Sequence, residues 1–214
     1  MTAPPLAELK PMLLAEAKQA RADAGVWCEL KWDGYRLFAE VRGAHVALQS
    51  RNGADATGWY PELARDLAGL TPTRTVLDGE VVVLDDLGRS DFERLHARSR
   101  RRGWYDGADA VVFVAFDVLV HRGRDVRGQP LEARKALLAR LLAKRRPSVL
   151  LSQHVDGLHA PELYAKACQL KLEGIVLKRL GSPYTCGERN GDWVKVKRPG
   201  ATPAQRFERG DLSV

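Results

Sequence analysis

The sequence predicts a single domain of the α+β class. Its 214 residues are 45% hydrophobic and 29% charged, which is enough apolar material for one substantial core. Short strand-like segments are mixed with amphipathic helix-like segments along the chain, and no internal repeat, low-complexity run or interdomain linker divides them. We therefore expect one domain over residues 1–214, with a lead-in over residues 1–25 and a tail over residues 198–214.

The first half of the chain predicts a strand meander, a helix and a hairpin. Short apolar or alternating segments separated by glycines are typical of strands, and leucines at helical spacing follow them. Residues 75–85 resemble a strand that turns back on itself at Asp78-Gly79, so we expect a hairpin there. The other expected elements are strands at residues 26–30, 36–41 and 45–50 and a helix at residues 60–70.

The second half alternates helices and strands. Ser90 stands three residues before Glu93, a capping-box pattern that predicts the start of a helix. Residues 110–120 are apolar except for Asp117, which predicts a strand buried on both faces and a buried acid that needs a partner. The remaining expected elements are a helix over residues 131–146 that ends at Pro147, a strand at 149–153, a helix at 161–171, and strands at 174–180 and 193–197.

Charge and cysteine content narrow the class of protein. Thirty-four Lys and Arg residues stand against 27 Asp and Glu residues, and the resulting net charge of +7 favours polyanionic partners such as nucleic acid or nucleotides. Three cysteines without a Cys-x-x-Cys spacing indicate neither a disulfide framework nor a tetrathiolate zinc site. No segment resembles a signal peptide or a membrane span, so we expect a cytoplasmic protein without membrane contact.

A lone lysine in the stretch "CELKWDGYR" raises a question of chemistry. Lys31 follows an apolar strand and precedes a turn at Asp33-Gly34. An amine in such a position is either a structural cation with an acidic partner or a nucleophile whose pKa has been lowered. The stretch alone leaves both interpretations open.

Polar and charged residues interrupt or end strands at five further points. Each motif alone is weak, but six motifs in a fixed order are specific. The ordered set resembles the motifs of the ATP-dependent DNA ligases within the covalent nucleotidyltransferase superfamily, and in particular the ligase modules of bacterial end-joining proteins. The resemblance covers roughly residues 10–198 and rests on Lys31-x-Asp33-Gly34-x-Arg36, Ser50-Arg51-Asn52-Gly53, Asp78-Gly79-Glu80, Phe116-Asp117, Glu173-Gly174-Ile175-Val176 and Lys195-x-Lys197.

This resemblance implies a fold and a reaction. The family fold is an ATP-grasp-like adenylation domain in which antiparallel sheets, flanked by helices, hold ATP between them. Lys31 is then the nucleophile that attacks the α-phosphate of ATP and becomes lysyl-AMP, which requires the pKa of about 10.4 of a free lysine to be lowered. Lys195 and Lys197 are implied to do this and to neutralise phosphate charge, with Lys195 preferred. Without the other motifs, the segment that contains them would be more typical of an edge strand with solvated lysines.

The acidic motifs are implied to serve the metal and the ribose. Glu80 and Glu173 stand beside glycines, where a carboxylate can approach Mg²⁺ or Mn²⁺, and Mg²⁺ commonly bridges to substrate phosphates. The family uses the same positions for the ribose hydroxyls. Taken alone, Glu80 is more typical of a turn and Glu173 of a helix end.

The remaining family positions contact the nucleotide. Phe116 is implied to stack on adenine, although a phenylalanine in an apolar run is ordinarily part of a core. Glu29 matches the position that accepts a hydrogen bond from the adenine amino group, which favours ATP over GTP, and Leu30 beside it belongs to the same pocket. Arg36 and Arg51 match positions that hold the ribose and the phosphates.

Two basic clusters lie outside these motifs, at residues 96–105 and 144–146. Each is either a helix end with cations that suit the helix dipole or a contact for the DNA backbone. The five histidines lack metal-ligand spacing, and we assign them no role.

The sequence therefore predicts an ATP- and Mg²⁺-dependent enzyme that forms lysyl-AMP and transfers AMP to a 5′-phosphate in nicked or broken duplex DNA. The alternatives are an RNA ligase and a non-catalytic nucleotide- or DNA-end-binding module. The family's DNA ligases continue into an oligonucleotide-binding domain, and residues 198–214 are too few to form one. We expect that function to come from a separate oligonucleotide-binding domain or a repair partner.

Overall fold

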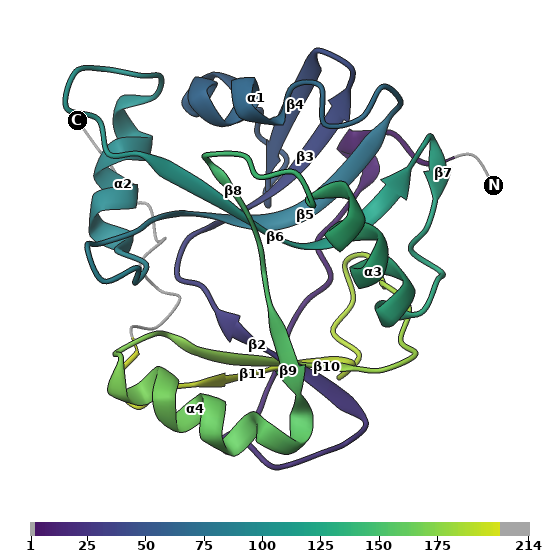
Figure 1. The fold of residues 1–214 in the computed structure, drawn as a ribbon, viewed down its shortest axis with the longest axis vertical. Helices are drawn as coiled ribbons and strands as arrows, with labels where there is room; N and C mark the ends of the chain where they lie inside the picture. Colours follow the sequence, from purple (N-terminus) through teal and green to yellow (C-terminus); the bar gives the residue numbers. More distant parts are fainter. Residues whose placement is uncertain (1–2, 202–214) are drawn as a thin grey trace, which may run out of the picture.

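Residues 3–201 are described by the computed structural model, which confirms the α+β class (Figure 1). Two β-sheets lie one above the other, and helices cover their outer faces. The tail expected over residues 198–214 lies, from residue 202 onwards, outside the described residues. Among the described residues, no helix combines the length and apolar character needed to cross a bilayer.

Sheet A forms the upper half of the molecule in Figure 1. Its strands are β3 (Tyr35–Arg42), β4 (His45–Ser50), β5 (Thr75–Val83), β6 (Val111–His121), β7 (Arg124–Asp125) and β8 (Val149–Leu151). They follow the order β4-β3-β5-β6-β7, and β8 pairs with β6 beside that path. Every pair is antiparallel except β6 with β8. Two strands of the predicted meander, β3 and β4, therefore join the later strand β6 in this sheet. The meander is wrong for its first strand, because residues 26–31 pair in the other sheet.

Sheet B forms the lower half and contains both early and late segments of the chain. Its strands are β1 (Ala15–Glu16), β2 (Val26–Lys31), β9 (His154–Asp156), β10 (Gly174–Arg179) and β11 (Trp193–Lys197). The order is β1-β11-β10-β2-β9, and only the β1 and β11 pair is parallel. The lead-in expected over residues 1–25 thus supplies an edge strand of this sheet.

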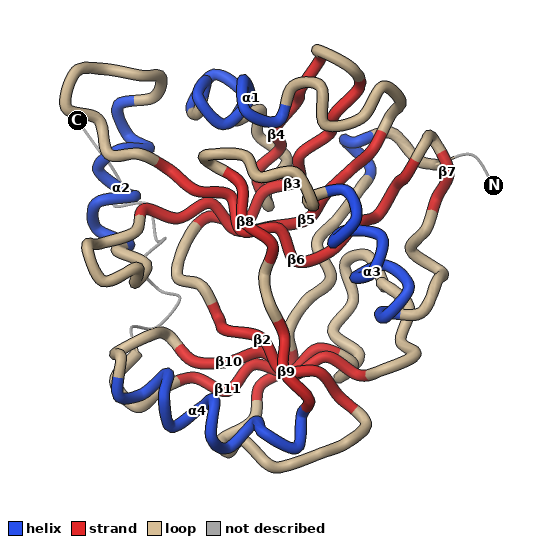
Figure 2. Tube along the Cα trace, in the orientation of Figure 1, coloured by secondary structure: helices blue, strands red, loops and turns tan. Residues whose placement is uncertain are grey.

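Four α-helices and three short 3₁₀ helices complete the described fold. They are α1 (Pro61–Leu67), α2 (Phe92–Arg101), α3 (Leu131–Leu141) and α4 (Ala160–Gln169), with η1 (Leu6–Glu8), η2 (Thr57–Trp59) and η3 (Gly157–His159). Helix α4 covers the outer face of sheet B, whereas α1, α2 and α3 lie against sheet A (Figure 2). The two inner faces of the sheets are left to face each other.

Three apolar clusters hold these layers together. Leu63, Leu95 and Leu138 of the upper helices pack on sheet A. Cys28, Ile175, Val196, Ala160 and Ala167 join sheet B to α4. The third cluster lies between the sheets and contains Leu9, Met12, Phe38, Val76, Leu119, Val120, Tyr184 and Trp193. Because the third cluster includes residues of the lead-in, the first dozen residues help to join the two sheets.

The hairpin expected at Asp78-Gly79 is wrong, because β5 runs straight through it. Asp78 is fully buried in this strand and forms an ion pair with Arg36, so its polarity marks a buried interaction and not a turn. Gly79 is required by packing, since an added Cβ would lie 2.5 Å from the ring of Phe113. A register shift between Asp78 and Gly79 is the only trace of the irregularity that the sequence suggested.

Two predicted helix boundaries also differ. Helix α2 is capped by Asp91, whose side chain accepts a hydrogen bond from the backbone N–H of Arg94 at 3.0 Å, and not by Ser90. The Ser90 hydroxyl instead accepts from the backbone N–H of Asp33 at 3.2 Å. Helix α3 ends at Leu141, well before Pro147, so the proline does not terminate it.

The buried acid of strand β6 has the partner that the sequence required. Arg134 of α3 donates two hydrogen bonds to Asp117, at 2.9 and 3.0 Å, and both side chains are 0% exposed. Arg134 also donates to the carbonyl of Ser182 at 2.9 Å. This pair fixes α3 on sheet A.

Replacing Asp117 by Asn should destabilise the fold by about 3–5 kcal/mol, because it leaves the Arg134 charge buried without a counter-charge. Denaturant unfolding followed by circular dichroism measures the loss. Arg179→Gln, which removes a pair whose arginine is 64% exposed, is the matched control and should cost far less. A loss for Asp117→Asn no larger than that of the control contradicts this assignment.

Candidate functional site

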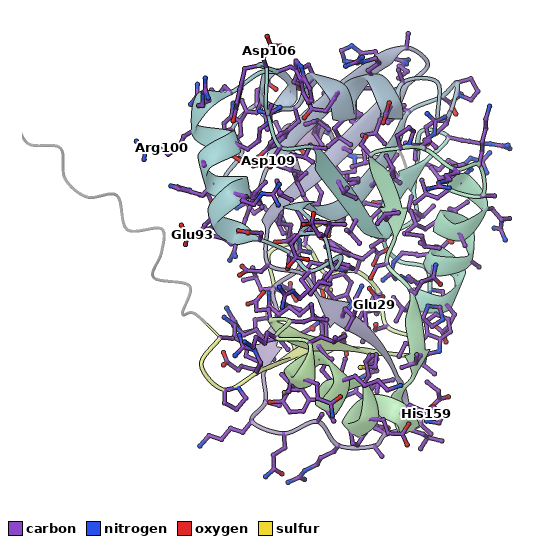
Figure 3. All side chains as sticks on the ribbon, turned by 60° about the vertical axis from the view of Figure 1, so that its left-hand side comes forward. Glu29, Glu93, Arg100, Asp106, Asp109 and His159 are labelled. Atoms are coloured by element: carbon purple, nitrogen blue, oxygen red, sulfur yellow. The ribbon has the colours of Figure 1, made fainter. Side chains whose placement is uncertain are left out.

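A pocket opens between the inner faces of the two sheets. Sheet A contributes Arg36, Glu80 and Phe116 to its lining, and sheet B contributes Glu29, Lys31, Lys178 and Trp193. Figure 3 shows Glu29 in the interior, at the level where the sheets face each other. Five of these seven residues were identified from the sequence, all but Lys178 and Trp193, and the fold gathers them at one place.

Strand alternation decides which side chains face the pocket. In β2, Glu29 and Lys31 point inward, whereas Cys28 and Leu30 pack toward α4. Leu30 therefore packs against the lower core, and it also belongs to the pocket lining. The same alternation in β11 places Trp193, Lys195 and Lys197 on the inner face.

Lys31 is held by an acid from the neighbouring strand. Its Nζ donates to Glu173 Oε2 at 2.6 Å, and Lys197 Nζ lies 3.2 Å from Glu173 Oε1. The Lys31 side chain is 16% exposed and that of Glu173 is 8% exposed. Gly174 permits this approach, because an added Cβ would lie 2.1 Å from the carbonyl oxygen of Val196. The three predicted residues Lys31, Glu173 and Lys197 thus form one ion-pair network.

The resemblance favoured Lys195 over Lys197 as the lysine beside Lys31, but the structure places Lys195 elsewhere. Its Nζ lies 3.1 Å from Glu16 Oε2, and this contact lowers the pKa of the Glu16 carboxyl. Lys195 is therefore at the edge of the inner face, next to strand β1, while Lys197 joins the network around Lys31. A catalytic role for Lys195 stays a prediction.

Glu29 is a buried carboxylate with two cationic partners. Its Oε1 lies 2.9 Å from Lys135 Nζ and 3.0 Å from Lys178 Nζ, and its Oε2 accepts from the hydroxyl of Ser152 at 2.7 Å. Burial opposes the charge of this carboxylate, but the two ammonium groups lower its pKa below the ordinary value. Glu29 is thus an acceptor at the bottom of the pocket.

Arg36 is anchored within the protein. It donates to Asp78 at 3.0 and 2.7 Å, to the carbonyl of Met12 at 2.7 Å and to the Tyr184 hydroxyl at 3.2 Å. Four contacts of five possible N–H donors leave little for a phosphate. Its guanidinium also lies 5.3 Å from the ring centroid of Phe116. These distances do not test the predicted contact of Arg36 with ribose or phosphate, which stays a prediction.

Phe116 stands at the wall of the pocket and is only partly buried. Its ring contacts Trp193 edge-on, with centroids 5.9 Å apart. The ammonium of Lys178 lies 4.7 Å from the Phe116 centroid and 4.2 Å from that of Trp193. The apolar surface of these rings suits the face of a flat base. Phe116 packs against the core cluster between the sheets and also lines the pocket. Its stacking on adenine stays a prediction.

Glu80 and Glu173 are the carboxylates available for a divalent cation. Burial raises the pKa of Glu80 to about 7, although Lys31 and Arg36 oppose the shift. Among the described residues, no three His, Cys, Asp or Glu side chains gather as a complete metal site. Two carboxylates without a third fit Mg²⁺, which takes its other ligands from waters and substrate phosphates.

A second, larger cleft begins at the same residues. It has a volume of about 790 Å³, and Arg36 and Glu80 belong to the linings of both this cleft and the pocket. Arg51, Arg100 and Arg102 also line this cleft, together with Trp59. Within residues 3–201 none of these three arginines has an acidic partner within ion-pair distance. The cleft is therefore suited to an anion.

Several site residues escaped the sequence analysis. Lys178 could be recognised from the sequence. It follows Glu173-Gly174 in the same strand and lies two residues after Val176, so both side chains point to the inner face. Trp193 has the same spacing relative to Lys195. Lys135 and Ser152 have no such signal, since they reach Glu29 from distant segments.

Comparisons with known proteins agree with this geometry. The family model described as ATP dependent DNA ligase domain matches residues 4–197. The multifunctional non-homologous end joining protein LigD of Pseudomonas aeruginosa is 43% identical over 175 residues, which are 81% of this chain and 20% of that protein. The SPbeta prophage-derived DNA ligase-like protein LigB of Bacillus subtilis is 34% identical over 88% of this chain and 67% of its own length.

A solved structure shares the fold. Mycobacterial DNA ligase D complexed with ATP and MES superimposes with a TM-score of 0.76 at 35% identity, over 90% of this chain and 61% of that one. The present chain thus spans about a fifth of the Pseudomonas LigD protein. The match of the family model to nearly the whole chain, together with these relatives, shows that the chain belongs to the family of ATP-dependent DNA ligase domains.

Proposed function

We propose that this chain is the adenylating unit of a DNA ligase, with Lys31 as the nucleophile. In the first step, Lys31 Nζ bonds to the α-phosphorus of ATP, the α–β phosphoanhydride bond breaks, and pyrophosphate leaves. AMP then passes from Lys31 to a 5′-phosphate of DNA, and a 3′-hydroxyl displaces it. The observation that carries the proposal is the ion pair of Lys31 with Glu173 beside the pocket that Lys31 lines.

Lys31 must lose a proton before it can attack. Glu173 Oε2 lies 2.6 Å from Lys31 Nζ and is the acceptor to which that proton can move. Lys197, on the other oxygen of the same carboxylate, adds positive charge beside the incoming phosphate. This arrangement positions the amine for the proposed phosphoryl transfer.

The remaining residues bind and orient ATP. Phe116 supplies a surface for the adenine ring, and Glu29 accepts from its amino group. Glu80 and Glu173 are the proposed holders of Mg²⁺, which when bound neutralises phosphate charge and steadies the leaving group. Arg51 faces the cleft where the phosphates emerge.

We further propose nicked or broken duplex DNA as the second substrate. The relatives named for end joining and DNA ligation support this choice, as do the net charge of +7 and the arginine-lined cleft next to Glu80. Arg100, which lines this cleft, projects outward from α2 (Figure 3).

Lys31→Ala should abolish the covalent AMP adduct, because among the described residues Lys31 is the lysine that both lines the pocket and contacts Glu173. Incubation with ATP and Mg²⁺ followed by intact mass spectrometry measures the adduct. Lys166→Ala on the exposed face of α4 is the control and should retain it. Adduct formation in Lys31→Ala would place the nucleophile elsewhere.

Glu80 should make the stability of the nucleotide-free protein depend on pH. Its pKa is about 7 in the fold against a reference value of 4.5, so between these values the native state keeps a proton that the unfolded chain releases. The free energy of unfolding should therefore fall as pH rises through this window. Glu80→Gln should lack that slope. Urea unfolding of both proteins at about pH 5 and about pH 7 tests this, and equal slopes would contradict it.

The arginines of the cleft should set the salt dependence of DNA binding. The double variant Arg100→Gln with Arg102→Gly removes two charges, and glycine suits the positive φ of 46° at position 102. The slope of log affinity against log salt for nicked duplex DNA should become shallower by about 2. Arg140→Gln on α3, at the opposite side of the molecule in Figure 1, should leave it unchanged. Weaker binding with an unaltered slope argues against phosphate contacts.

A further inference from the structure

Glu29 is held by two lysines that come from different parts of the fold. Lys178 belongs to β10, the strand next to Glu29 in sheet B, whereas Lys135 belongs to α3, which covers sheet A. Both ammonium groups lie within 3.0 Å of Glu29 Oε1, and all three side chains are 3% exposed. A buried carboxylate with two cations is more than charge balance requires, so the two lysines need separate explanations.

Lys178 is part of the pocket wall. It lines the pocket, and its ammonium lies over the rings of Phe116 and Trp193. Burial lowers the pKa of Lys178 to about 8. Its position and charge therefore respond to whatever occupies the space beside the rings.

Lys135 is fixed behind the carboxylate. Its Nζ donates to the carbonyl oxygen of Ser152 at 2.8 Å, and the hydroxyl of the same Ser152 donates to Glu29 Oε2 at 2.7 Å. Lys135 does not belong to the pocket lining. It is thus a counter-charge that a bound nucleotide neither touches nor displaces.

The charge state of Glu29 decides which base it can accept. An ionised carboxylate only accepts hydrogen bonds, so it suits the amino group of adenine and repels the carbonyl oxygen of guanine or hypoxanthine. A protonated carboxyl both donates and accepts, and it could bind either base. Burial favours the protonated form unless a cation opposes it.

We propose that Lys135 is a positioning residue for base selection: it holds Glu29 ionised and in one orientation, so that the pocket accepts ATP and rejects GTP. The proposal rests on the proposed function, in which Glu29 faces the base. Without Lys135, Lys178 becomes the sole counter-ion. The carboxylate must then turn toward Lys178 or take up a proton, and either change weakens the preference for adenine.

The other polar groups around Glu29 do not replace Lys135. His154 is the cross-strand neighbour of Glu29 in β9, but its ring stacks on Trp27, and burial lowers its pKa so that it favours the neutral form. Asp117 in β6 is paired with Arg134. Lys135 is therefore the fixed cation on this carboxylate within the described residues.

Lys135→Met tests the proposal through the ratio of kcat/KM for ATP to that for GTP in self-adenylation. We expect the ratio to fall about tenfold or more, because a loss of discrimination equivalent to one pKa unit is a factor of ten. Lys135→Arg should preserve the ratio because it keeps the charge, and Lys166→Met on the surface of α4 is the matched control. Equal losses for both nucleotides, or no change in the ratio, would overturn the proposal and leave Lys135 a structural residue.

A second measurement keeps the test independent of folding and of the covalent step. Lys135→Gln retains hydrogen bonding at the same position but removes the charge, and it is the substitute if Lys135→Met does not fold. Calorimetric binding of ATP and of GTP in a Lys31→Ala background should show the same loss of selectivity. Failure of the wild-type chain to form lysyl-AMP would reject the proposed function, whereas an unaltered ATP-to-GTP binding ratio rejects only the role of Lys135.

Discussion

The ion pair between Arg36 and Asp78 is the interaction on which the arrangement of the site depends. Asp78 is fully buried in the central strand of sheet A, and Arg36 on the neighbouring strand meets it with two hydrogen bonds. The hydroxyl of Tyr184 donates to the same carboxylate at 2.7 Å, and Tyr184 is itself buried, at 3% exposure. The backbone N–H of Met12 in turn donates to the Tyr184 hydroxyl at 2.9 Å. One buried charge thus ties the lead-in and the loop before β11 to sheet A.

This arrangement also explains why part of the Phe116 ring lines the pocket. The Arg36 guanidinium and the Trp193 indole support the ring from the core. A phenylalanine in an apolar run would otherwise bury its ring completely. Because cations and an indole occupy the positions around it, part of the ring surface is left for a flat ligand.

Two acids of the site are paired with lysines before any ligand binds. Glu173 is paired with Lys31 and Lys197, and Glu29 with Lys135 and Lys178. Each acid thus faces two cations, and the excess positive charge favours a polyphosphate. The ion pairs also limit the number of orientations that each side chain can adopt, which is the form of preorganisation that phosphoryl transfer requires.

The sequence by itself determined the class of fold, most of the strands and helices, and the family. The motifs can be recognised in the sequence because their residues lie at short, fixed spacing. In Glu29-x-Lys31 and Lys195-x-Lys197, for example, strand alternation requires two polar residues two positions apart. The tertiary structure alone decided that Asp78 continues a strand, that Lys197 and not Lys195 joins the network of Lys31, and that Lys135 reaches Glu29. These facts depend on contacts between residues that lie 24 to 142 positions apart in the sequence. A local pattern carries no information about such contacts, because the partner that neutralises a buried charge is chosen by the packing of the sheets.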